Sequence, residues 1–328
     1  MKRRRLGPFE VAEIGLGCMN LSHAYGTPPP KEAALGVLRR ALDLGVDHFD
    51  SAAFYGFGRN EELVGPALKP FRNRITLASK CGMQGVDGRR VIDGRPETLR
   101  KTLEDSLRRL ETDVIDLYYL HRYDKLNGVP IEDSVGEMAR MVREGKVRAI
   151  GLSEISVETL LKAHAIHPIA AVQSEYSLWS RGAEKGVIDA CRQISAAFVA
   201  FSPLARGFLA SADIDPDKFV ANDIRRGMPR FQSPHFETNV KLLPDYRQIA
   251  RDAGCSPAQL AIAWILSRSP NIIPIPGTTS SAHLEENVGA AACKLTAEIT
   301  GRLEALINEN TVSGARYPAA TLNEIDTE

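Results

Sequence analysis

The sequence lacks an excess of either charge, a CxxC motif and any apolar run approaching the roughly 20 residues of a membrane-spanning helix. Lys plus Arg and Asp plus Glu both number 41, so net charge favours neither nucleic acid nor an anionic membrane as a partner. The five cysteines are an odd number and lie far apart, which argues against a disulfide framework and a structural zinc site. The basic start from Lys2 to Arg5 is followed by Leu-Gly-Pro-Phe-Glu rather than an apolar segment, so we expect no secretory signal and a cytoplasmic protein.

The composition is that of a folded globular protein. Hydrophobic residues make up 44% of the chain and charged residues 25%, which allows a large core and excludes wholesale disorder. The 328 residues exceed one small domain but suit a single α/β barrel, a fold of typically about 250 residues or more. No linker or low-complexity tract divides the chain, so we expect one domain over residues 1–328.

Short β-rich runs alternate with longer amphipathic stretches along most of the chain. Eight such runs predict the strands of a closed (β/α)8 TIM barrel, at residues 14–17, 48–50, 75–79, 116–120, 149–152, 171–174, 197–201 and 272–274. The intervening patterns predict helices at residues 31–44, 60–68, 96–110, 131–144, 157–166, 183–194, 242–253, 257–267, 281–291 and 295–307.

Three segments depart from this alternation. Residues 5–11 are typical of a short hairpin, which we expect to plug the bottom of the barrel. About fifty residues from Ala205 to Cys255 form a long excursion after the seventh strand, and such excursions are more often functional than decorative. The last residues, up to Glu328, are polar and indicate no regular structure.

Titratable side chains follow three neighbouring predicted strands. Asp50 ends the second strand, Tyr55 lies on the loop after it, Lys80 ends the third strand and His121 ends the fourth. Because the carboxyl ends of barrel strands open into one mouth, these four groups are expected to meet there. Any one of them alone would be an ordinary cap, surface or core residue, but together they predict a site for proton transfer.

The chemistry of these groups suggests a role for each. A phenol has a pKa of about 10, and we expect the ammonium of Lys80 to lower it so that Tyr55 can act as acid and base. The carboxylate of Asp50 would keep Lys80 charged in a partly dry pocket. His121 would donate a ring N–H to a substrate oxygen and polarise a carbonyl.

The motifs DSAAFYG, ITLASK and DLYYLHRYD carry these residues, and together with later motifs the chain resembles an aldo-keto reductase over almost its whole length. It is most similar to the bacterial and plant branch of auxin-induced-type oxidoreductases. The resemblance implies reversible, metal-free, NADP(H)-dependent reduction of an aldehyde or ketone to the alcohol. Hydride would come from the nicotinamide and the proton from Tyr55, within the tetrad Asp50, Tyr55, Lys80 and His121.

The resemblance also implies where the cofactor binds. Ser153, Glu154 and Gln173, in AIGLSEIS and AVQSEYSLW, match the positions that bind the nicotinamide carboxamide. The family usually has Asn where Glu154 stands, and a carboxylate cannot donate to the carboxamide oxygen. In FVAFSPLARGFL, Phe201 matches the aromatic residue that stacks on the nicotinamide in the family. The turn that contacts the pyrophosphate is matched by Ser202, Pro203, Leu204 and Gly207.

The motif PIPGTTSSAHLEENVGAA matches the segment that holds the adenosine 2′-phosphate and the adenine. Its matching residues are Gly277, Thr278, Thr279, His283, Glu286 and Asn287. Many NADPH-selective members have Lys or Arg where this chain has Thr279 and Ser280. We therefore expect NADP(H), with weak selectivity over NAD(H).

The substrate is the least constrained expectation. The residues that could wall its pocket are Leu21, Phe54, Tyr123 and Trp179 together with the excursion around 225–236. An aromatic mouth would admit aldehydes, diketones, quinones or bulky ring ketones. We expect a small-molecule carbonyl substrate and a monomer or weak homo-oligomer. Three alternatives are an NADP(H)-sensing binding subunit resembling potassium-channel beta subunits, a Schiff-base aldolase using Lys80 and an inactive structural barrel.

Overall fold

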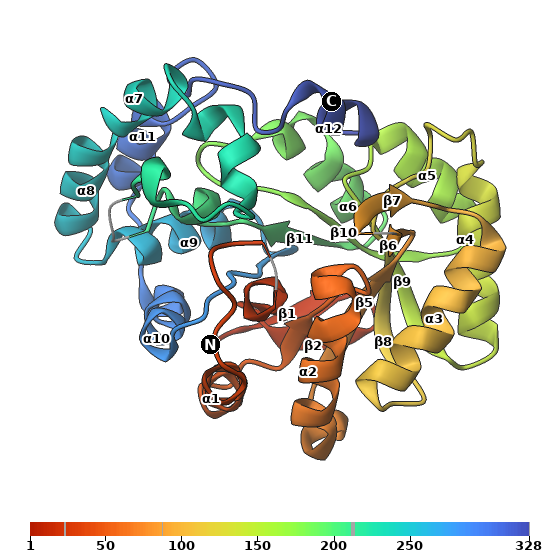
Figure 1. The fold of residues 1–328 in the computed structure, drawn as a ribbon. Coiled ribbons are helices and arrows are strands. Elements are labelled where there is room, and N and C mark those ends of the chain that lie inside the picture. The colour runs from red at the N-terminus through yellow and green to blue at the C-terminus, as the bar shows by residue number, and fades with distance from the viewer. Residues whose placement is uncertain (23, 87, 211–213, 328) are drawn as a thin grey trace.

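The computed structural model describes residues 1–22, 24–86, 88–210 and 214–327, and within them eight parallel strands form one sheet (Figure 1). The N–H groups of Gly15 and Gly17 donate to the carbonyls of Pro274 at 3.0 Å and Pro276 at 3.3 Å, which joins the two ends of the sheet. The predicted (β/α)8 barrel is confirmed. Its strands are β3 (Leu16–Gly17), β4 (His48–Asp50), β5 (Thr76–Cys81), β8 (Ile115–Leu120), β9 (Val147–Ser153), β10 (Ile169–Glu175), β11 (Ala197–Phe201) and β12 (Ile272–Pro274).

Alternate residues of these strands point to opposite faces of the sheet. In β11, Ala197 and Val199 belong to the inner core, whereas Phe198 packs outward against the helices. The same alternation puts Leu117 and Tyr119 of β8 inside the barrel. Every second residue of a strand therefore faces the inside of the barrel. At the carboxyl ends of the strands, these inward residues are polar rather than apolar.

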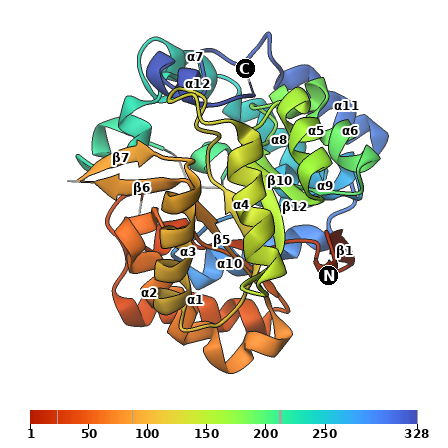
Figure 2. The same ribbon diagram turned by 90° about the vertical axis from the view of Figure 1, so that its right-hand side faces the viewer.

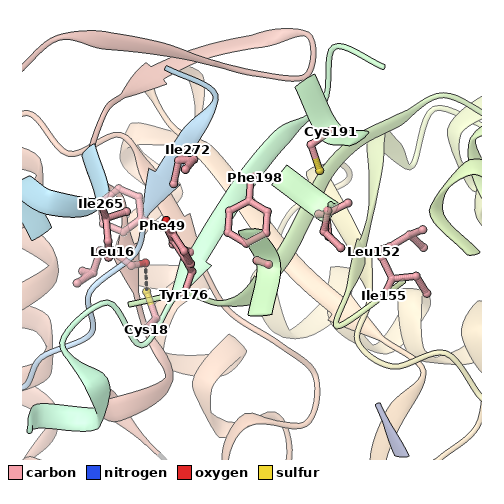
Figure 3. Close-up of a cluster of buried hydrophobic side chains, with 14 of the residues drawn as sticks. Leu16, Cys18, Phe49, Leu152, Ile155, Tyr176, Cys191, Phe198, Ile265 and Ile272 are labelled. Carbon is pink, nitrogen blue, oxygen red and sulfur yellow. Dashed lines mark hydrogen bonds between the residues drawn. The ribbon is translucent and has the colours of Figure 1, made fainter. Parts of the chain in front are cut away.

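Helices surround the barrel and cover the outer faces of the strands (Figures 1 and 2). In the buried cluster that Figure 3 shows, Leu16, Phe49 and Phe198 from the strands pack with Ile265 and Cys191 from helices. The helices are α1 (Lys31–Asp43), α2 (Arg59–Leu68), α3 (Pro96–Leu110), α4 (Ile131–Arg143), α5 (Val157–Ile166), α6 (Val187–Gln193), α7 (His235–Val240), α8 (Leu243–Asp252), α9 (Pro257–Arg268), α10 (Ser281–Gly289), α11 (Ala297–Leu306) and α12 (Ala319–Glu324).

The N-terminal hairpin closes the bottom of the barrel. Its strands, β1 (Arg3–Leu6) and β2 (Phe9–Ala12), pair antiparallel. Leu6 and Val11 pack among the inward residues of the barrel strands. At the turn, Gly7 has φ +57° and a Cβ there would lie 2.5 Å from the Cβ of Ala170, so the turn needs glycine. The predicted plug is confirmed.

The structure differs from the expected elements in several places. The sixth helix is shorter than predicted because Gly186, with φ 139°, separates α6 from a preceding 3₁₀ turn. An antiparallel pair, β6 (Met83–Val86) and β7 (Arg89–Ile92), extends beyond β5 and was not predicted. The tail expected to be irregular contains α12, although its last residue, Glu328, lies outside the described residues, as do 211–213 of the excursion.

No helix in the described ranges is long and apolar enough to cross a membrane. Over the same ranges, no group of three or more His, Cys, Asp and Glu side chains is arranged to hold a metal ion. The five cysteines are free; Cys18, Cys81 and Cys191 are buried, and Cys255 and Cys293 are partly exposed.

Candidate active site

Polar side chains gather where the inner faces of the strands end. Asp50 ends β4, Lys80 lies near the end of β5 and His121 directly follows β8. His121 continues the inward register of Leu117 and Tyr119, which is why it faces the mouth of the barrel. The structure therefore brings together the side chains that the strand-end pattern predicted.

Asp50, Lys80 and Tyr55 form a hydrogen-bonded chain. The Nζ of Lys80 forms an ion pair with Oδ1 of Asp50, donates to the backbone carbonyl of Ser51 at 2.8 Å and lies 3.3 Å from the Oη of Tyr55. Lys80 is 0% exposed and Asp50 is 1% exposed, so water does not screen the pair. Gln173 in β10 donates from Nε2 to Oδ2 of Asp50 at 2.8 Å and holds the carboxylate from its other side.

Burial and charge act against each other on Lys80 and Tyr55. Burial alone would lower the pKa of Lys80, but Asp50 and Tyr55 outweigh burial and raise it, so the ammonium stays charged. For Tyr55 burial is the largest effect and raises the pKa above its ordinary value, while Lys80 acts in the opposite direction. The expectation that Lys80 lowers the pKa of Tyr55 is thus wrong for the net shift, because desolvation of the phenolate outweighs the nearby ammonium. The site keeps Tyr55 as a protonated phenol.

His121 and Tyr55 lie next to each other on a large cavity. Their ring centroids are 5.7 Å apart and the rings meet edge to face at 84°. Both side chains, with Asp50, line a cavity of about 820 Å³ at the carboxyl end of the barrel. Lys80 is not among the lining residues, but its ammonium bonds to Asp50 and lies next to the hydroxyl of Tyr55, both of which line the cavity. A reacting group in the cavity can thus reach the phenol and the imidazole together.

Most of the residues expected to bind the cofactor line the same cavity. They are Ser153, Gln173, Phe201, Ser202, Pro203, Leu204, Gly207, Gly277, Thr278, Thr279, His283, Glu286 and Asn287. In the turn after β11, the N–H of Gly207 donates to the carbonyl of Leu204 at 3.0 Å, so this N–H does not point to a phosphate. Gly207 has φ +93° and carries no side chain, which lets a ligand approach the backbone closely.

The donors and acceptors on this lining suit a dinucleotide. Asn287 in α10 is 2% exposed, and its Oδ1 has no hydrogen-bond partner among the described residues. A buried acceptor without a partner is costly, and an exocyclic amino group such as that of adenine would satisfy it. Gly277 lies so close to the backbone oxygen of Gly17 that a Cβ would approach it to 2.9 Å, so the close approach of these two segments needs glycine at this position.

Comparison with known proteins agrees with this arrangement. The profile of the Aldo/keto reductase family matches residues 13–308. This chain belongs to that family. It is 40% identical over 312 residues to a protein of Glycine max named probable aldo-keto reductase 1. The aligned residues cover 94% of this chain and 89% of that relative. Aldo/keto reductases are oxidoreductases that use nicotinamide cofactors.

Solved structures share the barrel of this aldo/keto reductase. A glycerol dehydrogenase from Gluconobacter oxydans matches with a TM-score of 0.83 and 29% identity, covering 93% of this chain and 94% of that chain. An aldo/keto reductase from Klebsiella pneumoniae, solved in complex with NADP and acetate, matches with a TM-score of 0.73 and 27% identity, covering 97% and 99%.

In this aldo/keto reductase Glu154 does not line the cavity, so its expected contact with the carboxamide does not fit the geometry. Glu154 has φ 54°, in the left-handed region that non-glycine residues rarely adopt, and its carboxylate is buried. The carboxylate accepts from the N–H of Glu175 at 2.9 Å and forms an ion pair with Arg316 in the tail. The difference from the Asn usual in the family thus serves the C-terminal tail.

A buried network of charges holds that tail over the barrel. Glu175, at the end of β10, accepts from Arg206 at 2.6 Å and lies 3.5 Å from Arg316. Arg206 also donates to the hydroxyl of Tyr317 at 2.8 Å. Burial would raise the pKa of Glu175, but Arg206 and Arg316 outweigh burial and lower it, so the carboxylate stays ionised. The tail is therefore attached by charge-assisted bonds to the ends of the strands.

The tail and the β6/β7 pair supply parts of the cavity wall that were not predicted. Tyr317, Pro318 and Thr321 line the cavity from the tail, and Met83 and Arg90 line it from the β6/β7 pair. Arg90 forms an ion pair with Glu324 of α12, which connects the two segments, and both views place them in the upper part of the molecule (Figures 1 and 2).

Four residues were expected to wall the substrate pocket. In the cavity lining that the described residues form, only Phe54 of these four is present. Trp179 stacks on Phe208 at a centroid distance of 4.5 Å and belongs to the core. Leu21 is buried in the same core, and Tyr123 packs against it. The structure thus places Trp179, Leu21 and Tyr123 outside the lining of this cavity.

The excursion after β11 does reach the cavity, as expected. Ile224, Arg225 and Met228 line it. The guanidinium of Arg225 lies over the ring of Phe219 at 4.0 Å and pairs with Asp223 at 2.7 Å. Sequence reasoning missed two further lining arginines, Arg122 and Arg206, although each is within a quoted motif.

Proposed function

We propose that this protein is an NADP(H)-dependent oxidoreductase that reduces an aldehyde or ketone to the alcohol and catalyses the reverse reaction. The observation that carries the proposal is the position of the Tyr55 phenol, 3.3 Å from the buried ammonium of Lys80 and edge to face with His121 on a large cavity. Such a set of groups can hold and deliver one proton at a defined point.

When bound, the dinucleotide would supply the hydride. Tyr55 would protonate the carbonyl oxygen, and the phenolate that remains would be stabilised by Lys80. Asp50 keeps Lys80 charged and in place, while His121 would orient the carbonyl by donating a hydrogen bond. These four side chains are the catalytic residues of the proposal.

Ser153 and Gln173 would hold the nicotinamide end of the cofactor, and Asn287 and Glu286 the adenine end. The loop between β12 and α10 has hydroxyls at Thr278 and Thr279 and no Lys or Arg, so a 2′-phosphate would gain few charge-assisted bonds. We therefore propose NADP(H) as cofactor with weak selectivity over NAD(H), in a cytoplasmic, single-domain protein that is a monomer or weak homo-oligomer.

The test removes one hydroxyl at a time. In Tyr55→Phe, the loss of the acid should lower kcat by about 10²- to 10⁴-fold for any carbonyl compound that the wild type reduces, as followed by NADPH absorbance. NADPH binding, followed by its fluorescence, should persist in this variant. Tyr123→Phe is the matched control, since it removes a phenol that is absent from the cavity lining, and should retain turnover.

Two results would contradict the proposal. Wild-type turnover in Tyr55→Phe would exclude Tyr55 as the acid. NADPH binding without turnover across a panel of aldehydes, diketones, quinones and ring ketones would favour a nucleotide-sensing subunit instead.

A further inference from the structure

Among the described residues four arginines line the cavity, and three of them form ion pairs: Arg90 with Glu324, Arg206 with Glu175 and Arg225 with Asp223. The fourth is Arg122, which directly follows His121. In the described part of the chain, no carboxylate forms an ion pair with it, so its positive charge is not neutralised locally.

Arg122 is only 6% exposed. Its Nη1 donates to the backbone carbonyl of His121 at 2.8 Å and to the hydroxyl of Ser153 at 3.3 Å. Its Nε has no partner among the described residues. These two bonds tie the guanidinium to the backbone of His121 and to the side chain of Ser153, and all three residues line the cavity.

The carboxylates that follow the neighbouring strands of the described chain have other cations as partners. Glu154 pairs with Arg316, and Glu175 pairs with Arg206. Asp50 is likewise matched by Lys80. An uncompensated buried cation costs folding free energy, and such a cost is common where a ligand supplies the missing charge.

We propose that Arg122 binds an oxyanion of the substrate, so that this enzyme prefers aldehydes or ketones that also bear a carboxylate or phosphate group. This inference rests on the proposed carbonyl reduction. A guanidinium suits such an anion because its planar N–H groups match two oxygens, and the bonds are charge-assisted. With the anion on Arg122 and the carbonyl oxygen between Tyr55 and His121, the substrate would be fixed at both ends.

The experiment measures a selectivity ratio by the loss of NADPH absorbance. One pair of substrates is succinic semialdehyde and its methyl ester, and a second is glyceraldehyde phosphate and glyceraldehyde. In each pair kcat/KM of the anionic compound is divided by that of the neutral one. The pair with the larger ratio in the wild type identifies the anion as carboxylate or phosphate.

In Arg122→Gln the ratio should fall by about 10- to 100-fold, the effect of a lost hydrogen bond to a charged group. Arg122→Lys keeps the charge and should retain most of the ratio. If Arg122→Gln does not fold, the preference of the wild type for the anionic member of a pair still decides the inference. Arg90→Gln, which changes a cavity arginine that has a carboxylate partner, should leave the ratio unchanged.

A wild type without preference for the anionic member of either pair would overturn the inference. So would equal losses on both members in Arg122→Gln, because Arg122 would then act only by holding His121. Failure of the proposed function looks different: the wild type would reduce none of the four compounds.

Discussion

Removing Arg316 should release the C-terminal tail and destabilise the protein. Its side chain is 9% exposed, and its partner Glu154 is 0% exposed, so Arg316→Met leaves a carboxylate in the interior without its cation. Breaking one partner of a buried pair typically costs about 3–5 kcal/mol, because the remaining charge is still desolvated. Glu175 keeps Arg206 at 2.6 Å, so we expect the penalty to come mainly from Glu154.

The double variant Glu154→Gln, Arg316→Met separates this effect from lost packing. The side-chain amide introduced by Glu154→Gln can still accept the N–H of Glu175, as the carboxylate of Glu154 does at 2.9 Å, but carries no charge. The double variant should therefore recover most of the stability lost by Arg316→Met, and the cycle reports the coupling between the two side chains.

The assay is denaturant unfolding of the wild type, both single variants and the double variant. Their free energies of unfolding are compared with one common slope for the dependence of the free energy on denaturant concentration. Limited proteolysis after residue 313 in the folded proteins would report the release of the tail. The reasoning is refuted if Arg316→Met lies within about 0.5 kcal/mol of the wild type, the usual range of a surface substitution. It is also refuted if the double variant is as unstable as Arg316→Met.

Two further predictions concern the reaction and the cofactor. Because burial raises the pKa of Tyr55, the phenol stays protonated to higher pH than an ordinary tyrosine, so carbonyl reduction should persist into alkaline pH while alcohol oxidation rises with pH. Lys80→Met removes the group that lowers this pKa and should move both limbs of the pH–rate profiles to higher pH. A shift to lower pH would contradict the assignment. Thr279→Arg should strengthen NADPH binding relative to NADH by about 10- to 100-fold in fluorescence titrations, through a charge-assisted bond to the 2′-phosphate. Thr279 is chosen over Ser280 because Ser280 caps α10 by accepting the N–H of His283. An unchanged ratio of NADPH to NADH affinity would place the phosphate elsewhere.

The barrel and the tetrad could be predicted because their signals are local. A strand of five residues such as β11 shows its two faces in its own sequence, and Asp50 and His121 end such strands. Once the strands are placed, parallel order brings these side chains to one mouth whatever the helices do in detail.

The rest depends on contacts between residues far apart in the chain. Glu154 and Arg316 are 162 positions apart, and nothing local to either indicates the pairing. Glu154 also has a left-handed φ although it is not glycine, which sequence patterns do not reveal. Likewise, the pKa of Tyr55 rises because desolvation outweighs Lys80, and only the depth of burial in the folded protein decides that balance.

The attachment of the tail by side-chain charges, rather than by a strand of the sheet, divides the molecule into two parts that can vary separately. Asp50 and Lys80 belong to strands, and Tyr55 and His121 lie in the segments that follow strands, whereas Tyr317 and Thr321 come from the C-terminal segment. A new ending that keeps Arg316 would therefore reshape one side of the cavity without moving Tyr55.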